Sequence, residues 1–452
     1  MQSVSLIGKR VSFLFVLSLS VVFQAKTQDN SPWSRYGLGD IVPSGNIVNR
    51  GMGHIGAAYS DFQTINFVNP ASYSRFGLQR SILDIGIDIN SRRLSDNRGS
   101  SYTSNNAVVP YLAAGFQIKP PKAKYDWGLA FGLRPLTKVS YNIISGSRIP
   151  AGDTVITLNE GSGGTYQAFL GSAIGFKNLS IGFNTGYRFG TADYITRVNI
   201  FNDTALDRYR SGQKKVGNTF GSAFLELGVQ YRIKLGLDTA KKRASFLQLG
   251  AYTSLQGKLR GNREELYETY FVSPQSGIEQ QIDSVSEKTD IPMNVLYPST
   301  YGFGVMYEYE GKTSLRIGAD VVLSNWANYA YDGVKDSKLQ NGWQVKTGAQ
   351  FIPDVTGRTK SYWSQVMYRT GFNYGLEPYK VDGNLNSYGI TFGAGLPIRR
   401  YSFAEVNRNN VINTSVEFGQ RGNRNMLLRE NYFRFSVSFS LSDIWFIKRK
   451  YD

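Results

Sequence analysis

Strict alternation of apolar and polar residues is the feature that most constrains the fold of this chain. Between Leu179 and Gly190 the odd-numbered residues are large and mostly apolar, with Thr185 as the exception, whereas every even-numbered residue is glycine, polar or charged. Successive side chains of a β-strand point to opposite faces, so one face of this segment is apolar and the other is polar. Its length matches the roughly ten residues of a tilted strand that crosses a bilayer. The segment therefore predicts a membrane-spanning strand.

The same pattern recurs to the end of the chain in about fourteen segments, the even number typical of single-chain bacterial outer-membrane barrels. We therefore predict an all-β fold, a membrane-spanning antiparallel β-barrel of about fourteen strands. A soluble secreted or periplasmic β-protein is the alternative. The segments cover residues 83–89, 112–118, 127–133, 166–170, 179–190, 223–233, 247–251, 301–307, 315–323, 343–351, 366–372, 390–394, 412–418 and 433–441.

The links between these segments alternate in length. Those after the second, fourth and eighth segments are short, whereas those after the first, third, fifth and seventh are long. Outer-membrane barrels join their strands by short periplasmic turns and longer external loops. We therefore predict external loops at residues 91–106, 135–164, 191–218 and 256–298.

Charged residues of both signs share the polar parity of the segments. A Lys or Arg that faced lipid at the bilayer midplane would cost about 2–4 kcal/mol, so we predict that these side chains face a polar lumen. Because both signs are present, we interpret them as a pairing network around interior protein, with a water-filled porin as the alternative. They are Asp84, Asp88, Arg134, Arg188, Glu226, Arg232, Glu308, Arg316, Asp320, Lys346, Arg369, Glu417 and Arg434.

The first residues have the pattern of a secretory signal peptide. Lys9 and Arg10 precede an apolar run from Val11 to Phe23, which is shorter than a spanning helix needs. We place the cleavage site between Ala25 and Gln28. The exported chain is predicted to lie in the bacterial outer membrane, in contact with its lipids.

Composition excludes several kinds of chemistry. The chain has no Cys and a single His, His54, so disulfides, thiolate metal sites, and metal clusters or acid–base pairs made of histidines cannot form, and we do not expect a histidine-based triad. We predict that the protein is not an enzyme and that it holds no metal and no cofactor. Its formal charge is +17, but an exported barrel is not expected to meet nucleic acid.

The residues before the first strand are rich in Gly, Ser and Asn and have no period that would form an independent strand or helix. They include Gly51–Ser60, GMGHIGAAYS, and Asn66–Ser72, NFVNPAS. This order resembles the N-terminal hatch of the FadL family, FadL/TodX-like outer-membrane channels for long-chain fatty acids and other hydrophobic compounds. Residues 297–298 and 315–326 are similar to the ninth-strand region of that family. The resemblance implies a fourteen-stranded barrel with a hatch folded inside it.

We accordingly divide the chain into a signal peptide (1–27), an N-terminal extension and luminal plug (28–77), a transmembrane barrel (78–441) and a periplasmic tail (442–452). Glycine permits close backbone approach and Asn-Pro favours a fixed turn. Arg134 and Pro135 are candidates for an opening in the wall, because proline cannot donate to a strand ladder. The candidates for plug gating, which would otherwise only shape the hatch, are Gly53, Gly56, Tyr59, Asn69 and Pro70.

The resemblance implies passive uptake of a hydrophobic or amphipathic small molecule, such as a long-chain fatty acid, gated by the plug. Two differences from the FadL family favour an alternative function. Residues 29–48 are polar where the family has a short apolar N-terminus, and the chain continues beyond the last strand into a basic tail. The alternative is a non-transporting barrel subunit of an outer-membrane protein assembly or secretion machine.

Basic residues at the predicted periplasmic rim are compatible with both an uptake channel and a barrel subunit. Near an anionic surface each basic residue gains about 1 kcal/mol, so these residues would anchor lipid headgroups or dock a partner of the envelope. The acidic link at 256–298 is a candidate for a cap over the outer mouth, for a ligand entry groove or for a contact with a surface lipoprotein. The docking candidates are Lys241, Lys242, Arg243, Lys448, Arg449 and Lys450.

Overall fold

The computed structural model describes residues 31–77, 80–118, 124–148, 154–201, 210–272, 279–356, 361–381, 383–398, 410–423 and 425–444. The predicted signal peptide and the docking candidates Lys448, Arg449 and Lys450 lie outside these ranges. Within them, no helix has the length and apolar character needed to cross a membrane.

Fourteen antiparallel strands close into one barrel, and the last of them, β20, pairs with the first, β2, over Arg80–Asp96. Each predicted segment lies on one of these strands, in order, so the predicted fold is confirmed. The strands are β2 (Arg80–Asp96), β4 (Leu112–Gln117), β5 (Tyr125–Arg148), β6 (Thr154–Phe176), β7 (Leu179–Phe201), β8 (Ser211–Asp238), β9 (Arg243–Ser254), β12 (Thr300–Glu310), β13 (Ser314–Ser324), β16 (Gly342–Ile352), β17 (Met367–Leu376), β18 (Asn386–Ile398), β19 (Asn410–Arg421) and β20 (Leu428–Ile444).

Side chains alternate between lipid and lumen as the sequence predicts. On β7, Ile181 is 58% exposed on the outer face, whereas Asn184 and Arg188 are buried in the lumen. The predicted luminal charges are likewise buried or half-buried on their strands. An apolar outer face needs no polar partners in lipid, while the charges gather where other polar groups can meet them.

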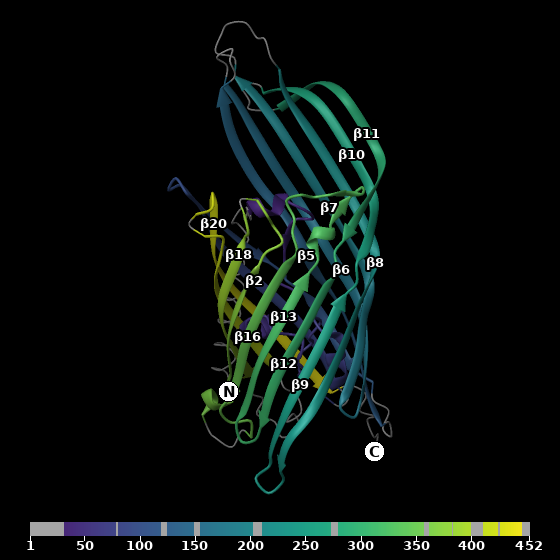
Figure 1. Cartoon of the computed structure of the whole chain (residues 1–452), viewed down its shortest axis with the longest axis vertical. Helices are drawn as coiled ribbons and strands as arrows, with labels where there is room; N and C mark the ends of the chain where they lie inside the picture. The colour runs from purple at the N-terminus through teal and green to yellow at the C-terminus, as the bar shows by residue number, and fades with distance from the viewer. Residues whose placement is uncertain are drawn as a thin grey trace, which may run out of the picture.

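The prediction of loops at the four long links is wrong, because most of their residues belong to strands. Residues 135–148 and 154–164 continue β5 and β6, and residues 91–96 and 101–106 belong to β2 and to β3 (Ser101–Val108). The link at 256–298 forms β10 (Gly257–Val272) and β11 (Glu279–Tyr297), and β10 pairs with the upper part of β8. Figure 1 shows β5 to β8, β10 and β11 rising above the rest of the wall. Both faces of this upper sheet lie outside lipid, so its strands lack the strict alternation that the bilayer imposes.

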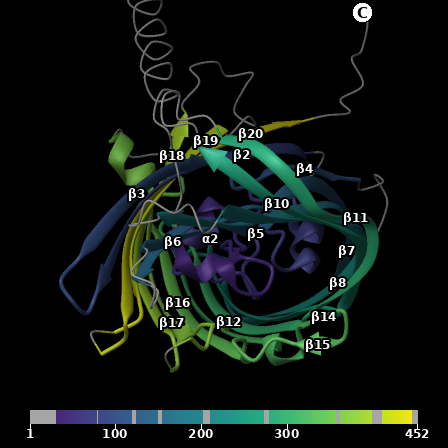
Figure 2. The same ribbon diagram turned by 90° about the horizontal axis from the view of Figure 1, so that it is seen from above.

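Residues 31–76 lie inside the ring of strands, as Figure 2 shows for α2, and are called the inner segment below. The inner segment contains η1 (Pro32–Arg35), β1 (Asp40–Ile41), α2 (Ile47–Gly51) and η2 (Pro70–Arg75). The Asn46 side chain caps α2 by accepting from the Asn49 N–H, and Asn69 caps η2 with Pro70 in its first turn. Helices this short are not stable alone, so the barrel must hold them in place.

The inner segment contributes to every apolar cluster of the described residues. Trp33 and Leu38 pack in an upper cluster with loop residues such as Tyr329 and Tyr379. Further clusters join Phe67 and Tyr73 to wall aromatics, and Met52 and Ile55 to Met306. The upper cluster also includes the short elements η3 (Trp326–Asn328) and β14 (Ala330–Tyr331), which leads into β15 (Val334–Lys335), while η4 (Tyr362–Gln365) precedes β17.

Glycines of the wall let the backbone of the inner segment touch the strands. A Cβ at Gly250 would lie 2.0 Å from the Ala57 carbonyl oxygen, and a Cβ at Gly348 would lie 2.2 Å from that of Met52. Distances this short require the backbone of the inner segment to move. Glycine at these lumen-facing positions is therefore part of the fit between wall and inner segment.

We expect Gly250→Ala and Gly348→Ala each to lower the free energy of unfolding by about 1–3 kcal/mol, because overpacking displaces the inner segment. Thermal unfolding of the barrel in detergent, followed by the mobility shift of folded barrels on gels, measures the change. Gly257→Ala is the matched control, because no atom lies within 4 Å of its added Cβ. Equal stability of all three variants would contradict this fit.

Candidate functional site

A cavity of about 250 Å³ lies in the lumen between the inner segment and the wall. Asp40 to Ser44, His54 and Val68 line it from the inner segment. One part of its wall is charged and the other is apolar and aromatic. The charged part includes Arg92, Glu417, Arg421, Glu430 and Arg434, and the apolar part includes Tyr252, Tyr297, Val322, Trp326 and Trp343.

Asp40 of β1 joins the inner segment to the charged part of this cavity. Its carboxylate accepts from Arg421 Nη2 at 2.7 Å and from Arg92 Nη1 at 2.9 Å. Burial alone would raise the pKa of Asp40, but the two guanidinium charges outweigh burial and hold the pKa well below its ordinary value. Asp40 is therefore ionised and paired.

Arg50 of α2 makes a second buried tie to the wall. Its Nη1 contacts Asp88 Oδ2 on β2, and both side chains are almost completely buried. Arg50 Nε donates to the Gly45 carbonyl oxygen at 2.8 Å, so the guanidinium also fixes the turn before α2. A guanidinium has the fixed fork of donors that such a multiple contact requires.

His54 lies 3.2 Å from Glu417 through Nε2 and Oε1. Burial lowers the pKa of His54, and the nearby Lys346 and Arg434 charges lower it further, while Glu417 opposes them in part. The neutral imidazole therefore donates Nε2–H to Glu417, which also accepts from Arg434 Nη1 at 2.6 Å. His54 has a φ of 67°, so its backbone is held in the left-handed region by these surroundings.

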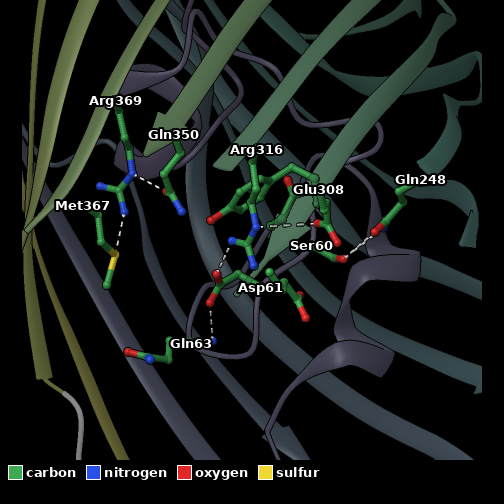
Figure 3. A network of polar contacts seen from close by, with 12 residues as sticks. Ser60, Asp61, Gln63, Gln248, Glu308, Arg316, Gln350, Met367 and Arg369 are labelled. Atoms are coloured by element: carbon green, nitrogen blue, oxygen red, sulfur yellow. Dashed lines mark hydrogen bonds and ion pairs between the residues drawn. The ribbon is translucent and has the colours of Figure 1, made fainter. Parts of the chain in front are cut away.

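The inner segment is also tied at the end of the lumen opposite the upper sheet. Arg316 Nη1 of β13 donates to Asp61 Oδ2 at 2.6 Å (Figure 3). Within the wall itself, Arg232 Nη2 of β8 donates to Glu308 of β12 at 2.9 Å. In the same view Ser60 faces Gln248 of β9. Here too, charges of the inner segment find their partners on the wall.

All five predicted gating residues contact the wall or fix the inner segment. Gly53 donates its N–H to Thr391 Oγ1 at 2.8 Å, and Gly56 donates to Asp320 Oδ2 at 2.6 Å. The Asn69 side chain donates to carbonyl oxygens of Ala57, Val229 and Ala251, and Pro70 starts η2. Tyr59 is buried, which raises its pKa to about 12. A gating role for these residues stays a prediction.

Arg134 and Pro135 lie where the wall is interrupted. Pairing of β4 with β5 ends at Leu112 and Leu133, and a register shift follows between Pro135 and Thr137. Beyond this point, β1 pairs with the edge of β5 that β4 has left. Asp40 pairs with Lys138, and the Val42 N–H donates to the Leu136 carbonyl oxygen at 2.9 Å. Arg134 bridges Glu226 and the Ser44 carbonyl oxygen, each at 3.1 Å. Whether this interruption opens stays a prediction.

Lys241, Lys242 and Arg243 lie exposed at the turn that joins β8 to β9. Figure 1 shows this turn at the end of the barrel opposite the upper sheet. Their position suits contact with headgroups or with a periplasmic partner, and the docking role stays a prediction.

Sequence reasoning did not single out Asp40, Arg50, Asp61 or Arg421. The only available signal was that Asp40, Arg50 and Asp61 are among the few charges of a glycine-rich stretch. Alternation identifies the luminal face of a strand, but it does not assign partners within the inner segment. The ion pairs between the inner segment and the wall are therefore visible only in the folded structure.

Comparisons with known proteins agree with this architecture. A protein-family model described as BamG matches residues 7–452. A search of curated proteins found no match. Solved structures share the fold at low identity, including the CymD monoaromatic hydrocarbon channel, with 13% identity, a TM-score of 0.53, and 90% of this chain and 99% of that chain covered.

A FadL homologue of Pseudomonas aeruginosa gives 12% identity and a TM-score of 0.52, with 91% of this chain and 100% of that chain covered. The Pseudomonas putida toluene transporter TodX gives 14% identity and a TM-score of 0.52 over the same shares. The resemblance to FadL-like barrels is thereby confirmed at the level of fold. The protein is an outer-membrane barrel of bacteria.

We expect Asp40→Ala to lower the free energy of unfolding by about 1.5–3 kcal/mol. The substitution removes the nearest carboxylate of Arg92 and Arg421 and leaves them the more distant Glu377 and Glu430, at 3.5–3.6 Å. The folded-state pKa of Asp40 lies below its ordinary value of 3.8, so its contribution is present above that value and is lost as pH falls through the lower pKa. The difference from wild type should therefore shrink in acid. Thermal unfolding at several pH values measures it.

The exposed Asp283 supplies the control, and Asp283→Ala should leave stability unchanged at every pH. A pH-independent effect of Asp40→Ala would show that the carboxylate charge is not what stabilises the barrel.

Proposed function

The chain belongs to the BamG family, and we propose, from the geometry of its lumen, that it is a sealed, non-transporting barrel subunit of an outer-membrane protein assembly or secretion machine. One observation carries this proposal. Ion pairs tie the inner segment to opposite parts of the wall, through the buried pairs of Arg50 with Asp88 and Asp40 with Arg421, and the half-buried pair of Asp61 with Arg316.

These ties make movement of the inner segment rare. Breaking a buried pair costs about 3–5 kcal/mol, so breaking the two buried pairs costs at least about 6 kcal/mol, which corresponds to roughly one molecule in 20,000. Hydrogen bonds from Gly53, Gly56 and Asn69 to the wall add to that cost. Passive uptake has no energy source to offset it, whereas a structural subunit gains from a rigid filled lumen.

The wall and the cavity support the same role. Strand β1 covers the upper side of β5 at the interruption near Pro135, where a molecule would otherwise pass sideways. The cavity is lined in part by Asp40, Arg92, Arg421 and Glu430, and a hydrophobic molecule would have to desolvate these groups. The exposed Lys241, Lys242 and Arg243 offer a periplasmic contact for the rest of the machine.

We expect the protein to be recovered in stoichiometric complex with other envelope proteins after gentle detergent extraction. Replacing Lys241, Lys242 and Arg243 by Glu should reduce that recovery at least about tenfold, because complementary charge at an interface becomes repulsive. Quantitative mass spectrometry of the purified material measures the ratio.

The matched control replaces Lys258, Lys335 and Lys338 by Glu, since these exposed lysines lie on the external side. Recovery of a lone barrel with co-purified lipid from wild-type cells would overturn the subunit role.

Uptake of an amphipathic small molecule is the second candidate, and a specific feature of the cavity favours it. Among the described residues, Arg134 Nε and Arg188 Nη1 are buried and donate to no partner. Both side chains line the cavity beside Tyr252 and Tyr297. Two guanidinium groups next to an aromatic wall suit a molecule with an anionic head and an apolar body, such as a long-chain fatty acid.

A flux assay separates the two candidates. For a sealed subunit, liposomes with the wild-type barrel should take up fatty acid no faster than empty liposomes, because the ion pairs hold the inner segment. Deleting residues 30–74 should make them leak. Faster wild-type uptake that Arg134→Ala and Arg188→Ala abolish, and that the exposed-site control Arg93→Ala preserves, would favour the channel.

A further inference from the structure

At the external end of the wall, one strand has an edge that pairs with none of the described residues. Among the described residues, β3 pairs only with β2, from Ser101 opposite Ser95 to Val108 opposite Asp88. The chain then leaves the ladder at residues 109–110, where Pro110 has no N–H. Strand β4 resumes the ring by pairing with both β2 and β5. No described part of β5 pairs with β3. Figure 2 shows β3 at the side of the ring, away from the inner segment.

An edge of this kind presents backbone groups to its surroundings. Alternate residues of a strand direct N–H and C=O to opposite sides, so about four residues of β3 offer these groups to the free side. Native proteins usually block such edges with Lys, Pro or bulges. Ser101–Val108 reads SYTSNNAV and contains neither a charged residue nor proline. The edge therefore lacks the usual protection against pairing.

The luminal face of β3 carries polar groups that also lack partners. Ser104 and Asn106 are each only 5% exposed, and Ser104 Oγ and Asn106 Oδ1 have no hydrogen-bond partner. Leaving such groups unsatisfied costs about 1–3 kcal/mol each. Side chains on the same face of an adjacent strand would lie about 5 Å away, within reach of both. A strand laid along the free edge would thus satisfy backbone and side chains together.

The residues on the outer face of β3 indicate where an added strand would lie relative to the lipid-facing belt. Ala107 is opposite Ile89, the last isoleucine of a lipid-facing row, whereas Asn105 and Thr103 are opposite Ser91 and Arg93. Only the lower end of β3 is therefore level with the apolar belt. The rest of the edge lies above it, on the external side.

We propose that β3 is a strand-addition site for an extended segment of a different polypeptide at the cell surface. The segment would place donors such as Ser, Thr, Asn or Gln opposite Ser104 and Asn106, and polar residues on its outer face. Strand addition of this kind derives its affinity from main-chain hydrogen bonds and its specificity from alternate side chains. The inference rests on the proposed subunit role, since it supplies the surface for one partner of the machine.

Amide hydrogen exchange tests this in the complex extracted gently from native membranes and in the purified barrel. Alternate amides of Ser101–Val108 should exchange at least about 100-fold more slowly in the complex, because they become part of a ladder. Thr103→Lys with Asn105→Lys should abolish that protection, since Lys on an edge opposes pairing. Val334→Lys on β15, another exposed edge strand, is the matched control and should change nothing.

The outcomes distinguish this inference from the proposed function. A stoichiometric complex in which β3 amides exchange as fast as in the purified barrel would overturn strand addition and leave the subunit role intact. Protection that persists in the purified barrel, or in liposomes that contain it alone, would assign the edge to a second copy or to lipid and also overturn the inference. Failure to recover any complex would overturn both.

Discussion

The neutralisation of buried charge in the lumen is the interaction on which the rest of this structure depends. A strand that crosses a bilayer can place its charges only on the luminal face, so the wall brings many of them into one confined space. Some pair with each other, as Arg434 does with Glu417, but Arg421, Asp88 and Arg316 take partners from the inner segment. Wall and inner segment are therefore each incomplete without the other.

The same dependence explains why the inner segment has so little regular structure. Buried N–H and C=O groups must be paired, and a chain without helices or ladders has to find partners elsewhere. Here the wall provides them, since Asp320 accepts from the N–H groups of both Gly56 and Ala57. Wall glycines such as Gly250 and Gly348 bring the two backbones close enough for such contacts. The barrel acts as the template on which a glycine-rich stretch folds.

The parts of this fold that could be predicted are those that lipid specifies. Lipid on one face and polar groups on the other enforce a period of two, so the strands and the luminal parity of residues such as Asp88 and Arg316 follow from the sequence. Above the membrane that constraint ends, and β10 and β11 carried no comparable signal. The pairing of Asp40 with Arg421 spans almost the whole chain, and no local pattern encodes a contact at that separation.

The polar N-terminal extension now has a physical explanation within the fold. Its residues supply β1, Asp40 and the apolar side chains Trp33 and Leu38, which together cover β5 where Pro135 interrupts the wall and pack beneath the external loops. An apolar N-terminus would have no charge to place between Arg92 and Arg421. The polarity of the extension and the charge of the upper lumen are thus matched, and this match closes the side of the barrel. The interruption near Pro135 is accordingly a joint between wall and inner segment, whereas the second edge of β3 pairs with no described residue.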